Sequence, residues 1–82
     1  MIDPLSPTPL YVQLADLLQG MIERGEIEAG KPLPSESYLQ QEYGLARGTV
    51  RAAVRALRER GLVATMPQRG TYVLPSAGGA GA

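Results

Sequence analysis

The 82-residue sequence contains no cysteine, no histidine, no tryptophan and no phenylalanine. The lack of cysteine excludes disulfide bonds and thiolate metal ligands, and it is typical of a protein from a reducing compartment. Histidine and cysteine are also the commonest general base and the commonest thiol nucleophile. Because so short a chain leaves little room for a substrate pocket, we expect a protein that is not an enzyme and holds no cofactor and no metal.

Long apolar runs are also absent. No stretch approaches the roughly 18 apolar residues that a membrane span needs, and the N-terminus lacks a basic-then-apolar secretion signal. Neither a GxGxxG, a GxxxxGK[ST] nor an HExxH motif occurs, and there is no internal repeat. With 44% hydrophobic residues the chain can build one aliphatic core. These features predict a single small cytoplasmic domain without membrane contact.

Apolar spacing and turn-forming residues predict three helices. We expect them to cover residues 9–24, 36–42 and 47–60. Thr8, followed by a proline, is the expected N-cap of the first helix, and Ser35 is the expected N-cap of the second. Gly44 predicts a short turn between the second and third helices. The last two helices are therefore expected to form a helix-turn-helix.

After the third helix, the runs "LVATM" and "TYVL" flank the turn sequence "PQRG", a pattern typical of a β-hairpin. A short strand near residues 31–33 would make its sheet three-stranded rather than two-stranded. The expected fold is therefore mainly α with a small β-hairpin, a winged helix-turn-helix. We expect an extended arm at residues 1–8, the folded domain at 9–74 and a disordered Gly/Ala-rich tail at 75–82.

Charge is distributed unevenly along a chain that is neutral overall, with 8 basic and 8 acidic residues. Residues 1–46 carry seven acids and two bases, whereas residues 47–74 carry six bases and one acid. The two parts therefore have net charges of −5 and +5. Such a concentration of positive charge indicates a polyanionic partner that the total charge would not reveal.

The third helix sorts its residues by type. At about 100° per residue, one side is apolar and consists of Val50, Ala53, Val54 and Leu57. An adjoining stripe is basic and consists of Arg47, Arg51, Arg55 and Arg58. Gly48 and Ala52 beside it are small enough to let a large partner approach. A solvated charged face is the alternative, but such faces usually mix both signs of charge. This pattern favours nucleic acid as the partner.

The second helix of a helix-turn-helix presents its N-terminal residues to base edges in the DNA major groove. Arginine there can donate to guanine O6 and N7, while neighbouring residues hold phosphates. Arg69, at the tip of the expected hairpin, is well placed for the minor groove or the backbone. Arg58 and Arg60 lie at the helix end, where cations stabilise the helix dipole, so a structural role is favoured for them.

Several fragments, in order and at the right spacing, resemble the winged helix-turn-helix domain of the GntR family of bacterial transcription regulators. They are "PLYVQL" (9–14), "LPSE" (33–36), "LARGTVRAAV" (45–54), "GLV" (61–63) and "RGTYV" (69–73). The resemblance covers about residues 9–74. It implies a sequence-specific operator binder that acts as a transcription regulator, here expected to be a repressor. It also implies a dimer and an effector-sensing domain after the wing, where this chain is expected to end.

The resemblance also implies which residues contact DNA. The candidate DNA-binding residues, including Arg55 from the basic stripe, are Ser35, Ser37, Arg47, Gly48, Thr49, Arg51, Arg55, Arg69, Gly70 and Thr71. Three positions depart from the family pattern. Ala46 replaces the usual Ser or Thr cap of the third helix, Ser37 replaces a common arginine, and Pro67-Gln68 replaces a more usual Gln-Gly at the wing.

The expected partner is therefore a double-stranded DNA operator, bound as a homodimer if the protein pairs at all, with no small-molecule effector site in this chain. Two alternatives remain open at this point. The same DNA-binding face could serve an architectural protein in excision or plasmid maintenance. A winged helix could also be used for protein contacts, with the acidic half of the chain as the docking surface.

Overall fold

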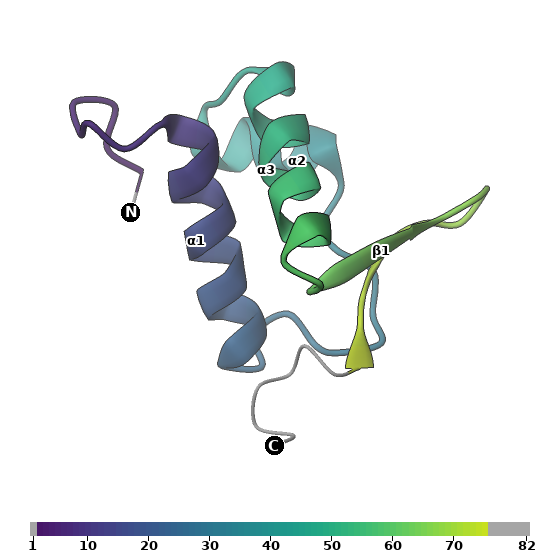
Figure 1. Cartoon of the computed structure of the whole chain (residues 1–82). Coiled ribbons are helices and arrows are strands. Elements are labelled where there is room, and N and C mark those ends of the chain that lie inside the picture. Colours follow the sequence, from purple (N-terminus) through teal and green to yellow (C-terminus); the bar gives the residue numbers. More distant parts are fainter. Residues whose placement is uncertain (1, 76–82) are drawn as a thin grey trace.

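The computed structural model describes residues 2–75, which form three helices followed by a two-stranded antiparallel sheet (Figure 1). The elements are α1 (Leu10–Glu23), α2 (Glu36–Tyr43), α3 (Arg47–Glu59), β1 (Val63–Met66) and β2 (Gly70–Val73). The expected winged helix-turn-helix is confirmed, with each helix ending within one residue of its predicted bound. Apart from its first residue, the predicted tail at 75–82 lies outside the described part of the chain.

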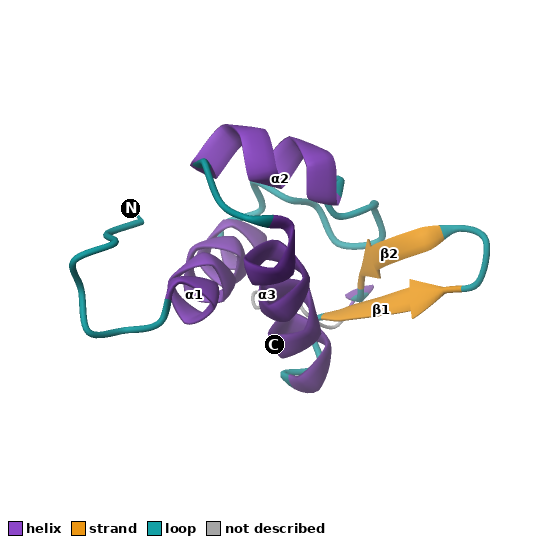
Figure 2. Cartoon of the chain, turned by 90° about the horizontal axis from the view of Figure 1, so that it is seen from above, coloured by secondary structure: helices purple, strands orange, loops and turns teal. Residues whose placement is uncertain are grey.

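Helices α1 and α3 lie side by side, α2 runs across them, and the hairpin extends away on the side of α3 (Figures 1 and 2). Each element contributes aliphatic side chains to one core. The largest fully buried side chains are Leu14, Leu18, Ile22, Leu39, Val50, Leu57 and Val73. The predicted apolar stripe of α3 is buried along its whole length. Within residues 2–75, no helix is long and apolar enough to cross a membrane.

The start of α1 differs from the prediction. Pro9, not Thr8, occupies the N-cap position, with an extended backbone (φ −54°, ψ 145°) and no side-chain cap. Its carbonyl oxygen accepts hydrogen bonds from the amides of Val12 and Gln13, both at 3.1 Å. The prediction of Thr8 as the cap was wrong because proline can hold the extended conformation of an N-cap as readily as the first helical one.

The arm before α1 contains a turn, in which the Ser6 amide donates to the Asp3 carbonyl at 3.1 Å. The side chain of Gln13 in α1 holds this turn in place. It accepts from the Asp3 amide at 2.6 Å and donates to the carbonyls of Asp3 and Thr8 at 2.9 and 2.8 Å. The arm is therefore held beside the helix by hydrogen bonds between the Gln13 side chain and the backbone of the arm, while Leu5 is exposed.

A short turn at Gly44 sets the direction of α3. Gly44 has a left-handed backbone (φ 65°) that glycine adopts at little cost, and its amide bonds to the Gln40 carbonyl at the end of α2. Ala46 then provides the N-cap of α3 with no side-chain hydrogen bond. The predicted weak cap is confirmed, so the first turn of α3 leaves amide donors available at the protein surface.

The hairpin pairs β1 with β2 in the register Val63↔Val73 to Met66↔Gly70. At its tip the Arg69 amide bonds to the Met66 carbonyl at 3.1 Å, and Gln68 adopts a positive φ of 64°. The third strand proposed near residues 31–33 shrinks to a single bridge between Pro32 and Tyr72. Prolines lack the amide that a continuing ladder needs, and two of them flank Leu33.

Candidate nucleic-acid interface

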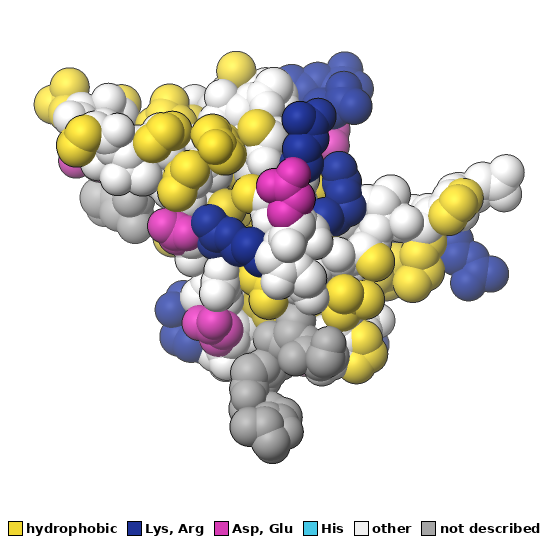
Figure 3. Space-filling model, viewed as in Figure 1, with side chains coloured by type: hydrophobic (Ala, Val, Ile, Leu, Met, Phe, Trp, Pro, Cys, Tyr) yellow, Lys and Arg dark blue, Asp and Glu magenta, His cyan; other side chains and the backbone are white. Residues whose placement is uncertain are grey.

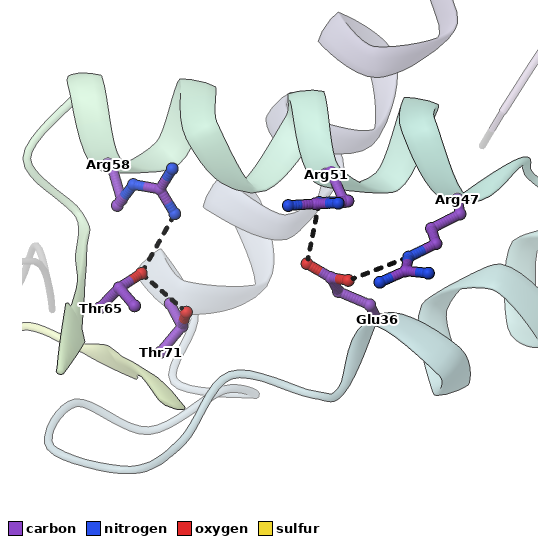
Figure 4. Close-up of polar contacts among 6 residues, drawn as sticks. All are labelled: Glu36, Arg47, Arg51, Arg58, Thr65 and Thr71. Atoms are coloured by element: carbon purple, nitrogen blue, oxygen red, sulfur yellow. Dashed lines mark hydrogen bonds and ion pairs between the residues drawn. The ribbon is translucent and has the colours of Figure 1, made fainter. Parts of the chain in front are cut away.

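The basic stripe of α3 is exposed beside its buried apolar face. Arg47, Arg51 and Arg58 project from the same side of the helix, toward the start of α2 and the wing (Figure 4). The side chains of Arg47 and Arg51 are 70% and 62% exposed, and Arg55 is also exposed. Figure 3 shows basic side chains gathered over the N-terminal part of α3, next to α2, with further basic atoms beside the hairpin. The charge asymmetry of the sequence thus becomes a local basic surface.

Between two of these arginines lies an acidic side chain that was not predicted to belong to the DNA-binding surface. Glu36, the first residue of α2, has one carboxylate oxygen 4.0 Å from Nε of Arg47 and the other 4.0 Å from Nε of Arg51 (Figure 4). Only its favourable position at the positive end of the α2 dipole could be predicted. The contact joins residues 11 and 15 positions apart, so it depends on how α2 and α3 cross.

The residues next to the arginines have small or partly buried side chains that protrude little from the surface. A Cβ atom built on Gly48 would meet no atom within 4 Å, apart from its immediate neighbours, and the backbone there has no positive φ. Thr49 is half-buried on the following position, and Ala52 is partly buried. Nothing within the described chain therefore requires glycine at position 48, whereas a closely approaching partner would.

The wing is tied to α3 through hydroxyl groups. Arg58 donates through Nη1 to Oγ1 of Thr65 at 3.1 Å, and the Thr65 hydroxyl shares a hydrogen bond with that of Thr71 at 3.0 Å (Figure 4). Thr65 and Thr71 are direct partners in the hairpin register. The structural role predicted for Arg58 was an interaction with the dipole at the end of the helix, and its observed contact is with the wing. The Thr71 hydroxyl forms its hydrogen bond within the protein.

The other two wing candidates lie at the tip of the hairpin. Arg69 is exposed. Gly70 has a φ of 96°, a backbone conformation that residues other than glycine rarely adopt. A hollow of about 330 Å³ lies between the wing, the start of α2 and α3. Its lining includes Ser35, Glu36, Val54, Arg69, Gly70 and Thr71. The hollow therefore brings the candidate residues at the start of α2 and at the wing together beside α3.

At the start of α2, the Ser35 hydroxyl accepts a hydrogen bond from the Tyr38 amide at 3.1 Å, so the predicted cap is confirmed. Ser37 is exposed. Tyr38 lies on the surface, with the residue 52% exposed. This short helix buries only Leu39, which leaves the preceding residue on a different face.

The end of α3 is fixed to α1 by Arg60, whose Nη1 lies 2.9 Å from Oδ1 of Asp16 and donates to Oε1 of Gln19 at 2.8 Å. The structural role favoured for Arg60 agrees with these contacts.

Two groups with raised pKa values lie on other parts of the molecule. A hydrogen bond to Glu26 raises the pKa of Arg24, and burial raises the pKa of the Tyr43 hydroxyl.

A sequence profile of the "Bacterial regulatory proteins, gntR family" matches residues 10–73. The chain is 48% identical over 65 residues to the "Mannosyl-D-glycerate transport/metabolism system repressor MngR" of Escherichia coli, covering 79% of this chain and 27% of that protein. It is 39% identical over 72 residues to the "HTH-type transcriptional repressor NagR" of Bacillus subtilis, covering 88% and 30%. The chain thus spans less than a third of each relative.

A solved structure with a similar fold contains DNA. The DNA-binding domain of AraR in complex with operator ORX1 superposes with a TM-score of 0.78 at 32% identity. The match covers 89% of this chain and 90% of that one.

Proposed function

The chain belongs to the GntR family of bacterial regulatory proteins, and we propose that its folded domain binds double-stranded DNA sequence-specifically as part of a transcriptional regulator. The observation that carries the proposal is the exposed arginine stripe at the start of α3, next to a glycine that the fold itself does not need. The operator complex of AraR, which has the same fold, supports DNA as the partner. The role is one of binding rather than catalysis.

In this proposal the first turns of α3 enter the major groove. Arg47 and Arg51 contact base edges, where a guanidinium can donate to both O6 and N7 of guanine. Gly48 and Thr49 lie beside them and allow the helix backbone to approach. Arg55, farther along the helix, contacts phosphate, which contributes affinity but little sequence preference.

The remaining candidates surround this helix. Arg69 and Gly70 at the wing tip contact the minor groove or the sugar-phosphate backbone, and Thr71 positions the wing through its bond to Thr65. Ser35 and Ser37 lie at the start of α2, where exposed polar groups can bond to phosphate. Ser35, Arg69, Gly70 and Thr71 line one hollow beside α3, which supports a common partner surface for the start of α2 and the wing.

Two finer points extend the proposal. The relatives MngR and NagR are named as repressors, which favours repression by covering a promoter over an architectural role or a role in protein contacts. Two copies would pair on a palindromic operator, with half-sites about one helical turn apart or a multiple of that spacing. A DNA target would also place the protein in the cytoplasm.

Selection of bound duplexes from a random DNA library tests the proposal. We expect one motif to be enriched, with palindromic symmetry if two copies pair. The matched control is the same protein with Arg47, Arg51 and Arg55 all replaced by alanine, which should enrich nothing while remaining folded by circular dichroism. Enrichment of no motif by the unchanged, folded protein at low salt would contradict sequence-specific DNA binding.

A further inference from the structure

Glu36 carries a negative charge on a surface that is otherwise basic. A carboxylate so close to DNA repels phosphate, so it cannot add to the general affinity of this surface for DNA. Its side chain is 43% exposed, and it lies between Arg47 and Arg51 rather than pointing away from them (Figure 4). The placement calls for a role other than charge neutralisation of DNA.

The geometry is the same on both sides of the carboxylate. One oxygen faces Arg47 and the other faces Arg51, and in each pair the nearest guanidinium nitrogen is Nε. A guanidinium approached at its Nε edge keeps the amino groups at its far end free to donate. Those groups are the ones that can reach O6 and N7 of a guanine together. The contact with Glu36 is therefore compatible with base reading by both arginines at once.

We propose that Glu36 is a specificity-determining residue, whose carboxylate positions Arg47 and Arg51 for base contacts and weakens binding to DNA of other sequences. The proposal rests on the proposed function of DNA binding. A free arginine side chain has many rotamers and loses them when it binds. The attraction of one carboxylate for both guanidinium groups, at 4.0 Å and without a hydrogen bond in either pair, narrows the range of positions that the arginines take before DNA arrives and so lowers that cost.

The same charge acts differently on the wrong sequence. Binding without base contacts depends on phosphate neutralisation by basic side chains, and the carboxylate opposes it. On the right sequence the base contacts outweigh this repulsion. Glu36 therefore raises the ratio of specific to non-specific affinity in two ways: it strengthens binding to the right sequence and weakens binding to other sequences. Loss of Glu36 should reverse both effects.

Three variants separate these effects. Glu36→Gln keeps the size of the side chain and removes its charge. Glu36→Asp keeps the charge and withdraws it from the arginines by one methylene group. Glu42→Gln is the matched control, because Glu42 lies on the same helix, is exposed and forms no ion pair with another described residue. Thermal unfolding of each variant establishes that the titrations compare folded proteins.

The measurement is the affinity of each variant for the selected duplex and for a scrambled duplex at several salt concentrations. For Glu36→Gln we expect tighter binding to the scrambled duplex and weaker binding to the selected one. Two exposed ion pairs of ordinary strength correspond to a fall of about two- to thirtyfold in the ratio of the two affinities. Glu36→Asp should lower the ratio through the selected duplex alone, and Glu42→Gln should change the ratio less than twofold.

The outcomes distinguish this inference from the function on which it rests. If the unchanged protein selects a motif and Glu36→Gln preserves the affinity ratio, the inference is overturned and the proposed function stands. If Glu42→Gln lowers the ratio as much as Glu36→Gln, general charge rather than the position of Glu36 is responsible, and the inference is again overturned. If Glu36→Asp keeps the full ratio, the positioning of the arginines is refuted. If the unchanged protein selects no motif, the proposed function fails first.

Discussion

Replacing Gly48 with alanine should make the protein more stable and a poorer DNA binder. Gly48 is the second residue of α3, its backbone has no positive φ, and an added Cβ would meet no other atom within 4 Å. Alanine in a helix is about 0.8–1.0 kcal/mol more favourable than glycine in an interior position, and somewhat less in the first turn. We therefore expect the free energy of unfolding to rise by about 0.5–1 kcal/mol, which corresponds to about 2–8 °C in Tm.

The loss of DNA affinity follows from the position of the new methyl group. It would stand on the surface beside the stripe that carries Arg47 and Arg51, where the proposed complex brings α3 into the groove. Displacement of either arginine from its base would cost about 1–3 kcal/mol, the usual range for a bidentate base contact. Thermal denaturation measures the first effect, and titration against the selected duplex measures the second.

Gly20→Ala is the matched control for this prediction. Gly20 lies inside α1, and its added Cβ would meet only the end of the flexible Arg24 side chain, at 3.0 Å from Nη1. It should raise the free energy of unfolding by a similar amount and leave DNA affinity unchanged. Full specific affinity in Gly48→Ala would refute a close approach of DNA to α3. A lowered stability would refute the helical backbone assigned to position 48.

Three further changes test the fold that presents the site. Ala46→Ser should raise the free energy of unfolding by about 0.5–2 kcal/mol, because a hydroxyl would cap the open first turn of α3; an unchanged or lower denaturant midpoint would show that residue 46 is not the cap. Leu57→Ala should lower the free energy of unfolding by about 2–5 kcal/mol, since the side chain is fully buried. A decrease of less than about 1 kcal/mol in urea unfolding would contradict that burial. Gly70→Ala should lower the free energy of unfolding by about 1–3 kcal/mol, because alanine rarely adopts the φ of 96° found at this position. An unchanged Tm would contradict this backbone conformation at residue 70.

Local patterns in the sequence were sufficient to predict the order of the elements. The cap at Ser35, the turn at Gly44 and the apolar stripe of α3 each depend on residues a few positions apart, and each is confirmed. The prediction of the first cap failed because Pro9 can also hold the extended conformation of an N-cap, so the sequence pattern alone did not decide between Thr8 and Pro9. The short strand near residues 31–33 failed because its prolines permit a bridge but no ladder.

The candidate site was predictable in composition but not in arrangement. The helical period alone placed the arginines on one stripe of α3. The contacts of Glu36 with two of them, and of Arg58 with Thr65, depend on how separate elements cross. The exposure of Tyr38 depends on how little of α2 reaches the core. No periodicity within one element reports such relations, because they are set by tertiary packing.

The central claim is that the first turns of α3 read base pairs. Its most direct test is the ratio of affinities for the selected and scrambled duplexes in Arg47→Ala, Arg51→Ala and Arg58→Ala, each measured at several salt concentrations. We predict that Arg47→Ala and Arg51→Ala lower this ratio by a factor that corresponds to about 1–3 kcal/mol. Arg58→Ala, which removes one positive charge and the hydrogen bond to Thr65 of the wing, should weaken binding to both duplexes alike. Loss of the ratio in Arg58→Ala, together with its preservation in both other variants, would contradict the proposed docking of α3.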